Sequence, residues 1–325
     1  MVYLGLLSLM RLLRMSKRKV YVYHGEGAEE KCRMELFASL KGAVKETYTV
    51  AYIEPADIIK GHWVKDAALL AVGGGYDLGL IRALGDRGIQ IIRNYVLQGG
   101  SYLGLCSGGY FACDFIEFDK GGPLDVCGER HLKFFPGLCE GPVFPNFKYN
   151  SFQGAVAVPT EFWDSNLQKV VKFHSYFNGG GHFQPYNHAK AVMKDHLRNQ
   201  LSGQTLETIP RAAIDHQTDL GSPSWGENSL HTSDLVPNFD ILAKYSSVEG
   251  APASIVKTTF GRGVAVLTGI HIECRDNHFP LDDPFVAAMI DDLKKSEKTR
   301  QQCFESLLHH LRLDWDKKNL FNKLK

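Results

Sequence analysis

Apolar and polar residues repeat with two different periods along the first third of the chain. Residues 20–24 alternate β-branched and aromatic side chains, as a strand does, whereas residues 29–41 place apolar side chains at helical spacing. Residues 67–72 and 102–105 are continuous apolar runs, which suit strands buried on both faces of a parallel sheet. The pattern predicts strands at Val20–His24, Tyr48–Ile53, Ala67–Val72 and Tyr102–Leu105, and helices at Glu29–Lys41 and Leu78–Leu97, the latter broken near Gly85 and Gly88.

Strands and helices therefore alternate, which is typical of a doubly wound sheet with helices on both faces. The second half of the chain is more strand-like, and its last helical stretch, Phe285–Leu313, contains a charged break at residues 294–300. We expect an α/β fold, a flavodoxin-like three-layer sandwich with a mainly parallel central sheet and additional β-rich segments. The further strands are expected at Gly154–Pro159, Lys169–Tyr176, Ile241–Tyr245, Ala253–Phe260 and Val264–Ile270.

Two stretches depart from this pattern. Residues 1–18 are apolar and basic, which predicts a leader or a disordered extension ahead of one domain spanning residues 19–325. A mitochondrial presequence has this composition. However, the stretch that begins at Met15 leads directly into the first predicted strand, so we favour translation from an upstream start, or a disordered leader, over a targeting segment. Residues 184–238 are polar and rich in turn residues, and they predict a surface insertion.

The overall charge and the cysteine content narrow the classes of function. The formal net charge is +1, which gives no electrostatic footprint for nucleic acid, so no nucleic-acid partner is expected. Seven cysteines without a C-x-x-C pair favour a reducing compartment over a disulfide scaffold or a zinc ribbon. No apolar run is long enough for a membrane helix. We therefore expect a cytoplasmic protein with no membrane partner.

The sequence GSYLGLCSGGYFACDF, at residues 100–115, places a cysteine between a predicted strand and a helix that begins near Tyr110. The glycines around Cys106 permit the sharp turn of a nucleophile elbow, with sulfur in place of the more common serine oxygen. A helix N-terminus at Ser107 would favour the thiolate form. The alternative is a buried structural cysteine, because a free cysteine behaves as a small hydrophobe.

The stretch AVLTGIHIECRDNH offers a base for this thiol. His271 and Glu273 stand at the carboxyl end of a predicted strand, and residues two apart on a strand project to the same side. The imidazole can then face the sulfur while the carboxylate orients it, which is the logic of a nucleophile–base–acid triad. The alternative is a solvated strand end in which the H-x-E spacing is incidental.

Together, GLCSGGYF and LTGIHIE resemble the class I glutamine amidotransferase-like family with its Cys–His–Glu triad. The stretches VYVYHGEG, VGGGYD, SYFNGGGHF and TTFGRGVAVLTGIHIE make the chain similar to the amidotransferase-like N-terminal domain of fungal biotin–protein ligases and related free-standing proteins. The resemblance covers residues 20–313. The family commonly shows H-P-E, and Ile272 takes the place of that proline while keeping the two-residue spacing.

The resemblance implies a role for individual residues. Cys106 would be the nucleophile, His271 the base and Glu273 the orienting acid, and neither a cofactor nor a metal would be needed. The oxyanion hole would be formed by Gly74, Gly75 and the backbone N–H of Ser107, and the substrate would be contacted by Gly108, Tyr110, Asn178, Gly179 and Gly180.

Two further motifs carry weaker indications. The glycine run of YFNGGGHF predicts a tight hairpin, and it makes His182 a surface histidine rather than a second polar group of a pocket. In ERHLKFFPG, Arg130 and Lys133 indicate either an anion site or, as we favour, a solvated edge beside a buried pair, Phe134 and Phe135.

These features leave more than one function open. The first is an enzyme in which Cys106 hydrolyses a carboxamide, from glutamine or another small-molecule amide or amino-acid-like substrate, through a thioester. A separate synthetase or biotin–protein ligase chain could receive the ammonia, and we do not expect this chain to biotinylate. The second is a non-catalytic regulatory module that binds a metabolite or a ligase, and the third is a sensor of oxidants or small electrophiles. The intact H-x-E spacing favours the enzyme, although fold and triad serve many chemistries.

Overall fold

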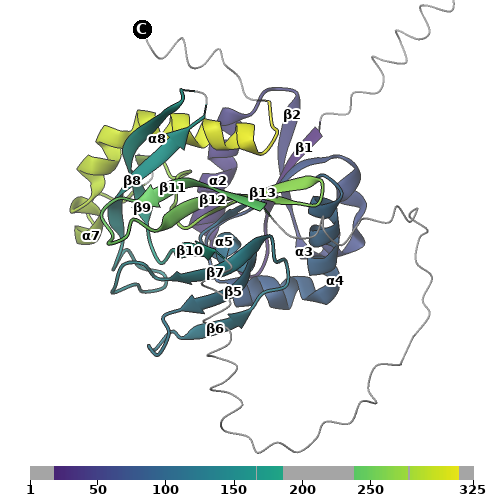
Figure 1. The fold of residues 1–325 in the computed structure, drawn as a ribbon, viewed down its shortest axis with the longest axis horizontal. Helices are drawn as coiled ribbons and strands as arrows, with labels where there is room; N and C mark the ends of the chain where they lie inside the picture. Colours follow the sequence, from purple (N-terminus) through teal and green to yellow (C-terminus); the bar gives the residue numbers. More distant parts are fainter. Residues whose placement is uncertain (1–17, 166, 186–237, 277–278, 315–325) are drawn as a thin grey trace, which may run out of the picture.

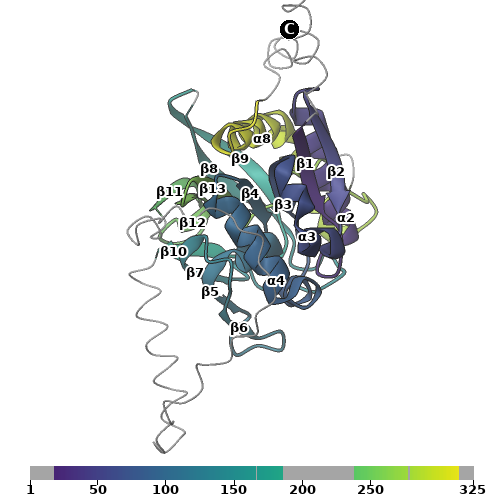
Figure 2. The same ribbon diagram turned by 90° about the vertical axis from the view of Figure 1, so that its right-hand side faces the viewer.

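The computed structural model describes residues 18–165, 167–185, 238–276 and 279–314. One sheet of 13 strands runs through these residues, with helices on both faces (Figures 1 and 2). The strands are β1 (Arg18–Tyr23), β2 (Tyr48–Ile53), β3 (Ala67–Val72), β4 (Ser101–Leu105), β5 (Cys113–Phe118), β6 (Val126–Glu129), β7 (Phe135–Gly141), β8 (Val156–Asp164), β9 (Lys169–Phe177), β10 (His182–Pro185), β11 (Asn238–Tyr245), β12 (Ala253–Phe260) and β13 (Gly263–Thr268). The helices are α2 (Glu30–Ala43), α3 (Pro55–Lys60), α4 (Asp77–Leu97), α5 (Ser107–Phe111), α7 (Pro284–Ala287) and α8 (Ile290–His310), with a 3-10 turn at His62–Lys65.

Five neighbouring strands, in the order β2-β1-β3-β4-β13, are parallel, and we call them the parallel half. Every residue of β3 and β4 is buried, as expected for strands covered on both faces. In β1, Val20 and Val22 pack in the apolar cluster that includes α2 and α8, whereas Tyr21 and Tyr23 pack in the cluster that includes α3 and α4. Because alternate side chains of β1 pack against helices on opposite faces, the sheet is the middle one of three layers.

The remaining strands are β12, β10, β7, β5 and β6 together with the branch β11-β8-β9, and we call them the antiparallel half. All their pairs are antiparallel except β5 with β7. The two halves meet where β13 pairs with β12. The prediction of an α/β fold with a mainly parallel central sheet and additional β-rich segments is confirmed.

The last helix corrects one expectation. Although residues 294–300 are rich in charge, α8 continues through them without a break. Leu293 and Arg300 lie on its buried side, and Arg300 is only 1% exposed. The Arg300 guanidinium donates to the backbone oxygens of Cys274 and Leu293, at 3.1 and 3.0 Å, so its charge is held inside the protein rather than interrupting the helix.

Other differences concern short elements. The helix after Cys106 ends at Phe111 and Cys113 begins β5, so the expected helix over residues 110–115 is wrong beyond its first turn. The hydrophobic pattern did not indicate β6, β7 and β10, which are short or contain glycine and proline. Gly85, with φ 55° and ψ −178°, does break the helical geometry as expected. Residues 1–17 and 186–237, which hold most of the expected leader and insertion, lie outside the described residues.

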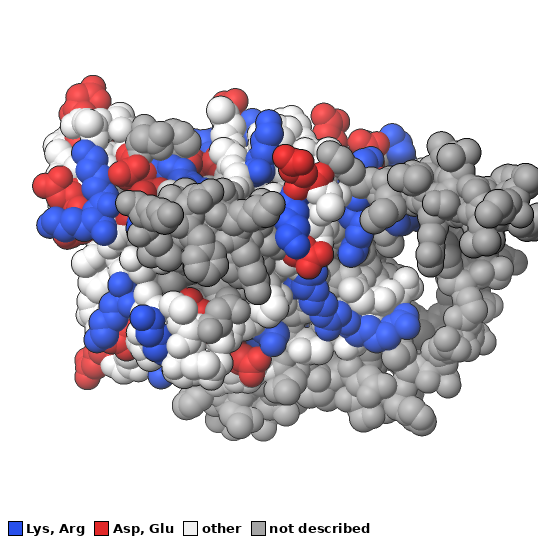
Figure 3. All heavy atoms as spheres, turned by 90° about the horizontal axis from the view of Figure 1, so that it is seen from above, with Lys and Arg blue, Asp and Glu red and all other residues white. Residues whose placement is uncertain are grey.

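Surface charge is mixed on the face shown in Figure 3, where blue and red side chains lie close to one another over the described residues. No helix in the described part of the chain is long and apolar enough to cross a membrane.

Candidate active site

Cys106 occupies the sharp turn between β4 and α5. Its φ of 49° and ψ of −107° lie in a region that residues other than glycine rarely adopt, and strain of this kind is typical of a nucleophile elbow. The Cys106 N–H donates to the Thr268 carbonyl at 2.8 Å, which ties the elbow to the end of β13. Gly104 permits the turn, because a Cβ there would collide with the Gly108 carbonyl. The thiol therefore stands at the carboxyl end of a central strand.

His271 and Glu273 form a buried pair just beyond β13. His271 Nδ1 and Glu273 Oε1 lie 2.8 Å apart, and the two residues are 2% and 1% exposed. The backbone differs from the expectation, because β13 ends at Thr268, the His271 N–H donates to the Tyr176 carbonyl, and residues 272–273 form a turn. The turn, and not the alternation of a strand, brings the two side chains together.

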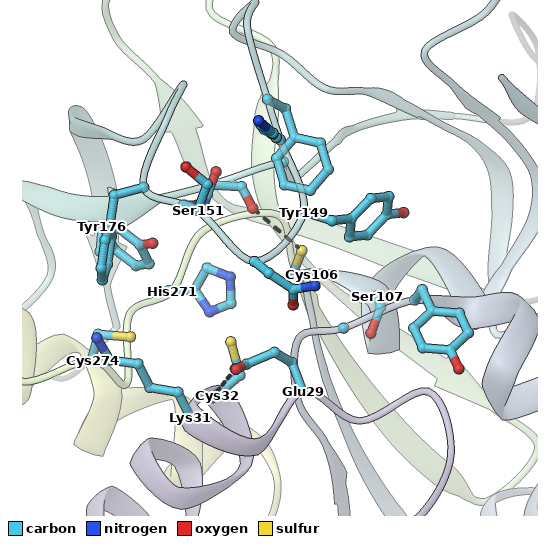
Figure 4. A pocket seen from close by; sticks show the side chains of 18 of the residues that line it. Glu29, Lys31, Cys32, Cys106, Ser107, Tyr149, Ser151, Tyr176, His271 and Cys274 are labelled. Carbon is cyan, nitrogen blue, oxygen red and sulfur yellow. Dashed lines mark hydrogen bonds between the residues drawn. The ribbon is translucent and has the colours of Figure 1, made fainter. Parts of the chain in front are cut away.

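Several groups surround the His271 imidazole (Figure 4). Burial lowers its pKa, but the Glu273 carboxylate and three nearby thiols outweigh that effect, so the pKa of His271 lies well above its ordinary value. The thiols belong to Cys32, Cys106 and Cys274. Burial raises the pKa of Cys32 and raises the pKa of Cys274 to about 12. The site therefore favours an imidazolium next to Cys106 and keeps the two other thiols neutral.

The glycine loop at residues 73–75 lies against the elbow. The Ser107 hydroxyl donates to the first carbonyl of this loop at 3.0 Å, and Ser107 and the last glycine line the cavity beside Cys106. Gly74 lies behind them, where a Cβ would be 2.7 Å from the Cε1 atom of His271. The loop and Ser107 thus lie against the elbow, and a side chain at position 74 would displace the imidazole.

A cavity of about 560 Å³ opens beside Cys106 and His271. The residues predicted to contact substrate divide into those that line the cavity and those that do not. Two of the predicted glycines pack against backbone carbonyl groups, where any Cβ would collide. Tyr110, Asn178 and Gly179 line the cavity, whereas Gly108 and Gly180 do not.

The sequence interpretation missed most of the aromatic side chains of the cavity. Local composition could have indicated some of these side chains, because the stretch FPNFKYNSF at residues 144–152 is dense in aromatic rings. It also missed Cys32, which lies far from the triad in sequence and is brought beside His271 only by the fold. The aromatic lining residues not predicted are Tyr76, Phe118, Phe147, Tyr149, Phe152, Tyr176 and Phe279.

The two cations of ERHLKFFPG have different surroundings. Arg130 is 4% exposed and its Nε donates to Asp77 Oδ2 at 2.5 Å, so the expected solvated edge is wrong for this residue. Pairing with an acid is what makes a buried arginine tolerable, and Asp77 itself lines the cavity. Lys133 is 35% exposed and pairs with surface acids, and Phe134 and Phe135 are buried as predicted.

One group of potential metal ligands occurs among the described residues. Ligand atoms of His271, Glu273 and Cys274 lie within 4.8 Å of one another, and all three residues are buried. The group contains both members of the histidine–glutamate pair, so a metal ion there would occupy the groups that a triad needs. His182 does not line the cavity and is half-buried beside Gln184.

A parallel α/β sheet with a cysteine elbow on a central strand, and a buried histidine–glutamate pair next to it, is the arrangement of class I glutamine amidotransferase-like proteins. Residues 18–204 and 225–325 match the family model described as "Biotin-protein ligase, N terminal", and the chain belongs to this family. Over 296 residues, which are 90% of this chain, it is 31% identical to a biotin–protein ligase of Schizosaccharomyces pombe. The chain spans 38% of the length of that ligase.

Other similarities are more distant. An uncharacterized protein of Chlamydia muridarum is 26% identical over 250 residues, which are 77% of each chain. Among solved structures, a candidate ThuA-like protein of Bacteroides uniformis matches with a TM-score of 0.43 and 10% identity over 90% of each chain. A candidate GMP synthase component of Thermoplasma acidophilum matches with a TM-score of 0.40 and 10% identity, covering 88% of this chain and 98% of the other. Scores this low carry no information about function.

Proposed function

We propose that this protein is a thiol amidohydrolase, in which Cys106 attacks a carboxamide and releases ammonia through a thioester. The observation that carries the proposal is the buried pair of His271 and Glu273, which lies beside an elbow cysteine on the wall of a cavity. A structural cysteine needs neither a strained elbow nor a neighbouring base.

The reaction would proceed in two steps. The Cys106 thiolate adds to the amide carbon, and the oxyanion accepts hydrogen bonds from backbone N–H groups of the 73–75 loop and Ser107. The His271 imidazolium gives its proton to the leaving nitrogen, so that ammonia departs and a thioester remains. Neutral His271 then takes a proton from a water molecule, which attacks the thioester, and the carboxylic acid is released. Glu273 accepts the Nδ1–H bond and stabilises the imidazolium in both steps.

A second candidate function is a non-catalytic module that binds a metabolite or a biotin–protein ligase. It is favoured by the Schizosaccharomyces pombe relative, a ligase in which the matching region is only part of a longer chain. Such a module needs the cavity but not the reactivity of Cys106, so reactivity separates the two candidates.

The first test is site-resolved alkylation of the whole protein. Iodoacetamide labelling from about pH 6 to 8, where activated thiols titrate, is followed by mass spectrometry. Cys106 should react fastest of the seven cysteines. Cys127 and Cys274 are internal references, because burial is the main cause that raises the pKa of each to about 12. His271→Ala should slow the labelling of Cys106, and Glu273→Gln should slow it less.

The second test is ammonia release from a panel of primary amides. Cys106→Ser should abolish release, while Cys127→Ser, a thiol outside the cavity lining, should leave it unchanged. If Cys106 reacts no faster than Cys32 or Cys274 and no amide is hydrolysed, the regulatory module becomes the better interpretation.

A further inference from the structure

Four aromatic rings form a continuous series next to the Cys106 thiol, and we call them the aromatic wall. Tyr110 meets Phe118 at a centroid distance of 5.7 Å, Phe118 meets Phe147 at 5.6 Å, and Phe147 meets Tyr149 at 4.9 Å, each edge to face. All four residues line the cavity. Tyr110 and Phe118 are 4% and 7% exposed, whereas Tyr149 is 40% exposed, so the wall runs from the interior to the surface.

Two residues of the wall, Tyr110 and Tyr149, carry hydroxyl groups. The Tyr110 hydroxyl donates to the Gly179 carbonyl at 3.3 Å. Tyr149 lies near Cys106 (Figure 4), and the thiol adds to the effect of burial that raises the pKa of Tyr149 to about 12. Ile116 and Val126 line the same side of the cavity. This side therefore offers an apolar surface that begins next to the nucleophile.

A second group of rings borders the histidine. Tyr176 lies between the His271 ring, at 5.5 Å, and the Phe279 ring, at 4.8 Å. The Lys31 ammonium lies 4.5 Å from the centroid of Phe152 and 5.1 Å from that of Phe279. Lys31, one of the two lysines that line the cavity, is thus engaged with ring faces.

The carboxylates of the cavity are also engaged within the protein. Glu29 accepts from the Cys32 N–H at 2.6 Å as the N-cap of α2, and Asp283 accepts from two N–H groups at the start of α7. Asp77 is paired with Arg130. An amino-acid substrate needs partners for an ammonium and for a carboxylate, and these three acids already accept hydrogen bonds within the protein.

One polar atom next to the thiol does fit an amide. Asn178 lines the cavity, and its backbone oxygen lies 3.9 Å from the Cys106 sulfur. Its side-chain Nδ2 donates to the Ser151 carbonyl at 2.9 Å, while its buried Oδ1 has no hydrogen-bond partner among the described residues. The backbone oxygen, which is the atom next to the thiol, can accept a hydrogen bond from a carboxamide NH₂ group.

From the aromatic wall and the Asn178 oxygen, we infer that the cavity takes an uncharged carboxamide with an apolar, ring- or chain-bearing acyl group, and not free glutamine. The amide would lie between Cys106 and Asn178, and the acyl group along the aromatic wall. A cavity of about 560 Å³ is in the size range of small-molecule sites. The inference names the substrate class of the proposed amidohydrolase and rests on that proposed function.

Binding and turnover are measured separately. Cys106→Ser protein, which cannot form the thioester, is titrated with 3-phenylpropanamide, hexanamide and L-glutamine in calorimetric and thermal-shift experiments. The two apolar amides should bind and raise the melting temperature, and glutamine should do neither. Wild-type protein should release ammonia from the apolar amides, with kcat/KM rising by roughly tenfold or more as the acyl group grows from acetamide to 3-phenylpropanamide.

The wall is tested with Phe147→Ala and Tyr149→Ala, and Trp163→Ala serves as the control, because Trp163 is similarly exposed at 43% but lies outside the cavity lining. Both wall variants should weaken binding of 3-phenylpropanamide, whereas the control should bind it as the wild type does. Tyr149 is a surface position, so Tyr149→Ala keeps the test usable if Phe147→Ala does not fold.

The outcomes distinguish the two claims. Binding of 3-phenylpropanamide to Cys106→Ser protein without ammonia release by the wild type would overturn the amidohydrolase and support the apolar ligand class. Binding and hydrolysis of glutamine with no response to the apolar amides would overturn the ligand class and leave the amidohydrolase standing. Absence of binding by all three amides would overturn the ligand class as well.

Discussion

The parallel and antiparallel halves of the sheet contribute different things to one cavity. The parallel half carries the proposed catalytic groups, since Cys106 follows β4, the glycine loop follows β3 and His271 follows β13. The antiparallel half carries most of the aromatic wall, with Phe118 on β5 and two more rings on the segment after β7. Reacting groups at the carboxyl ends of parallel strands are positioned by backbone geometry. The wall depends instead on how side chains from separate segments pack.

Three of the contacts that join the halves at the cavity come from different elements. The His271 N–H donates to the Tyr176 carbonyl on β9 at 2.8 Å. Arg130, which follows β6, pairs with Asp77 at the start of α4. The backbone at Gly180, which precedes β10, approaches the carbonyl after β13 so closely that no Cβ fits. If the halves act as one site, loss of these contacts should both lower the free energy of unfolding and slow the alkylation of Cys106.

The largest effect is expected from Arg130→Met, which leaves the Asp77 carboxylate buried without its partner. Removing one member of a buried ion pair costs about 3–5 kcal/mol of unfolding free energy. Lys133→Met is the matched control from the same motif, because its pairs are partly exposed and worth about 1 kcal/mol or less. Urea unfolding of both variants measures the difference. Equal losses would mean that Arg130 does not join the two halves.

A smaller effect is expected from Gly180→Ala, because the new methyl group would collide with the Gly269 carbonyl. Overpacking of this kind costs about 1–3 kcal/mol. Gly42→Ala is the control, since nothing lies within 4 Å of a Cβ at that helical position and alanine there should stabilise by about 0.5–1 kcal/mol. Gly180→Ala should also slow alkylation of Cys106, whereas Gly42→Ala should not. The opposite order of stabilities would rule out the close approach at Gly180.

The third effect is a pH dependence that belongs to the parallel half alone. Burial lowers the pKa of His271, but Glu273 and the nearby thiols raise it well above 6.5, so the folded protein holds this proton more tightly than the unfolded chain. The resulting stability is complete below pH 6.5 and is lost as pH rises through the folded pKa. Glu273→Gln removes the chief cause of the raised pKa.

The measurement is urea unfolding at several pH values between 6.5 and about 8, one unit below the ordinary pKa of 9.0 of the Cys274 thiol, so that this thiol contributes little. The wild type should lose stability relative to Glu273→Gln by up to about 1.4 kcal/mol per pH unit. A difference that does not change with pH would show that Glu273 does not hold the His271 proton.

Much of this arrangement could be predicted from local patterns, and the failures were also local. The continuous apolar runs at residues 67–72 and 102–105 indicated the buried parallel strands that they form. The elbow at Cys106 was predictable because Gly104 relieves a steric clash with the Gly108 carbonyl four residues further along the chain. The charged residues 294–300 were misleading, since a helix tolerates charge on its exposed side and Arg300 finds buried carbonyl partners from other segments.

Local sequence was enough to specify the alternation of strands and helices and the strained turn at Cys106, because each depends on backbone sterics and side-chain period over a few residues. Long-range packing was needed to bring Cys32 beside His271, to pair Arg130 with Asp77, and to assemble the aromatic wall from rings of three segments. These contacts join residues far apart in the chain. Their physical cause is the shared burial of apolar surface and the pairing of buried charge, which no local pattern encodes.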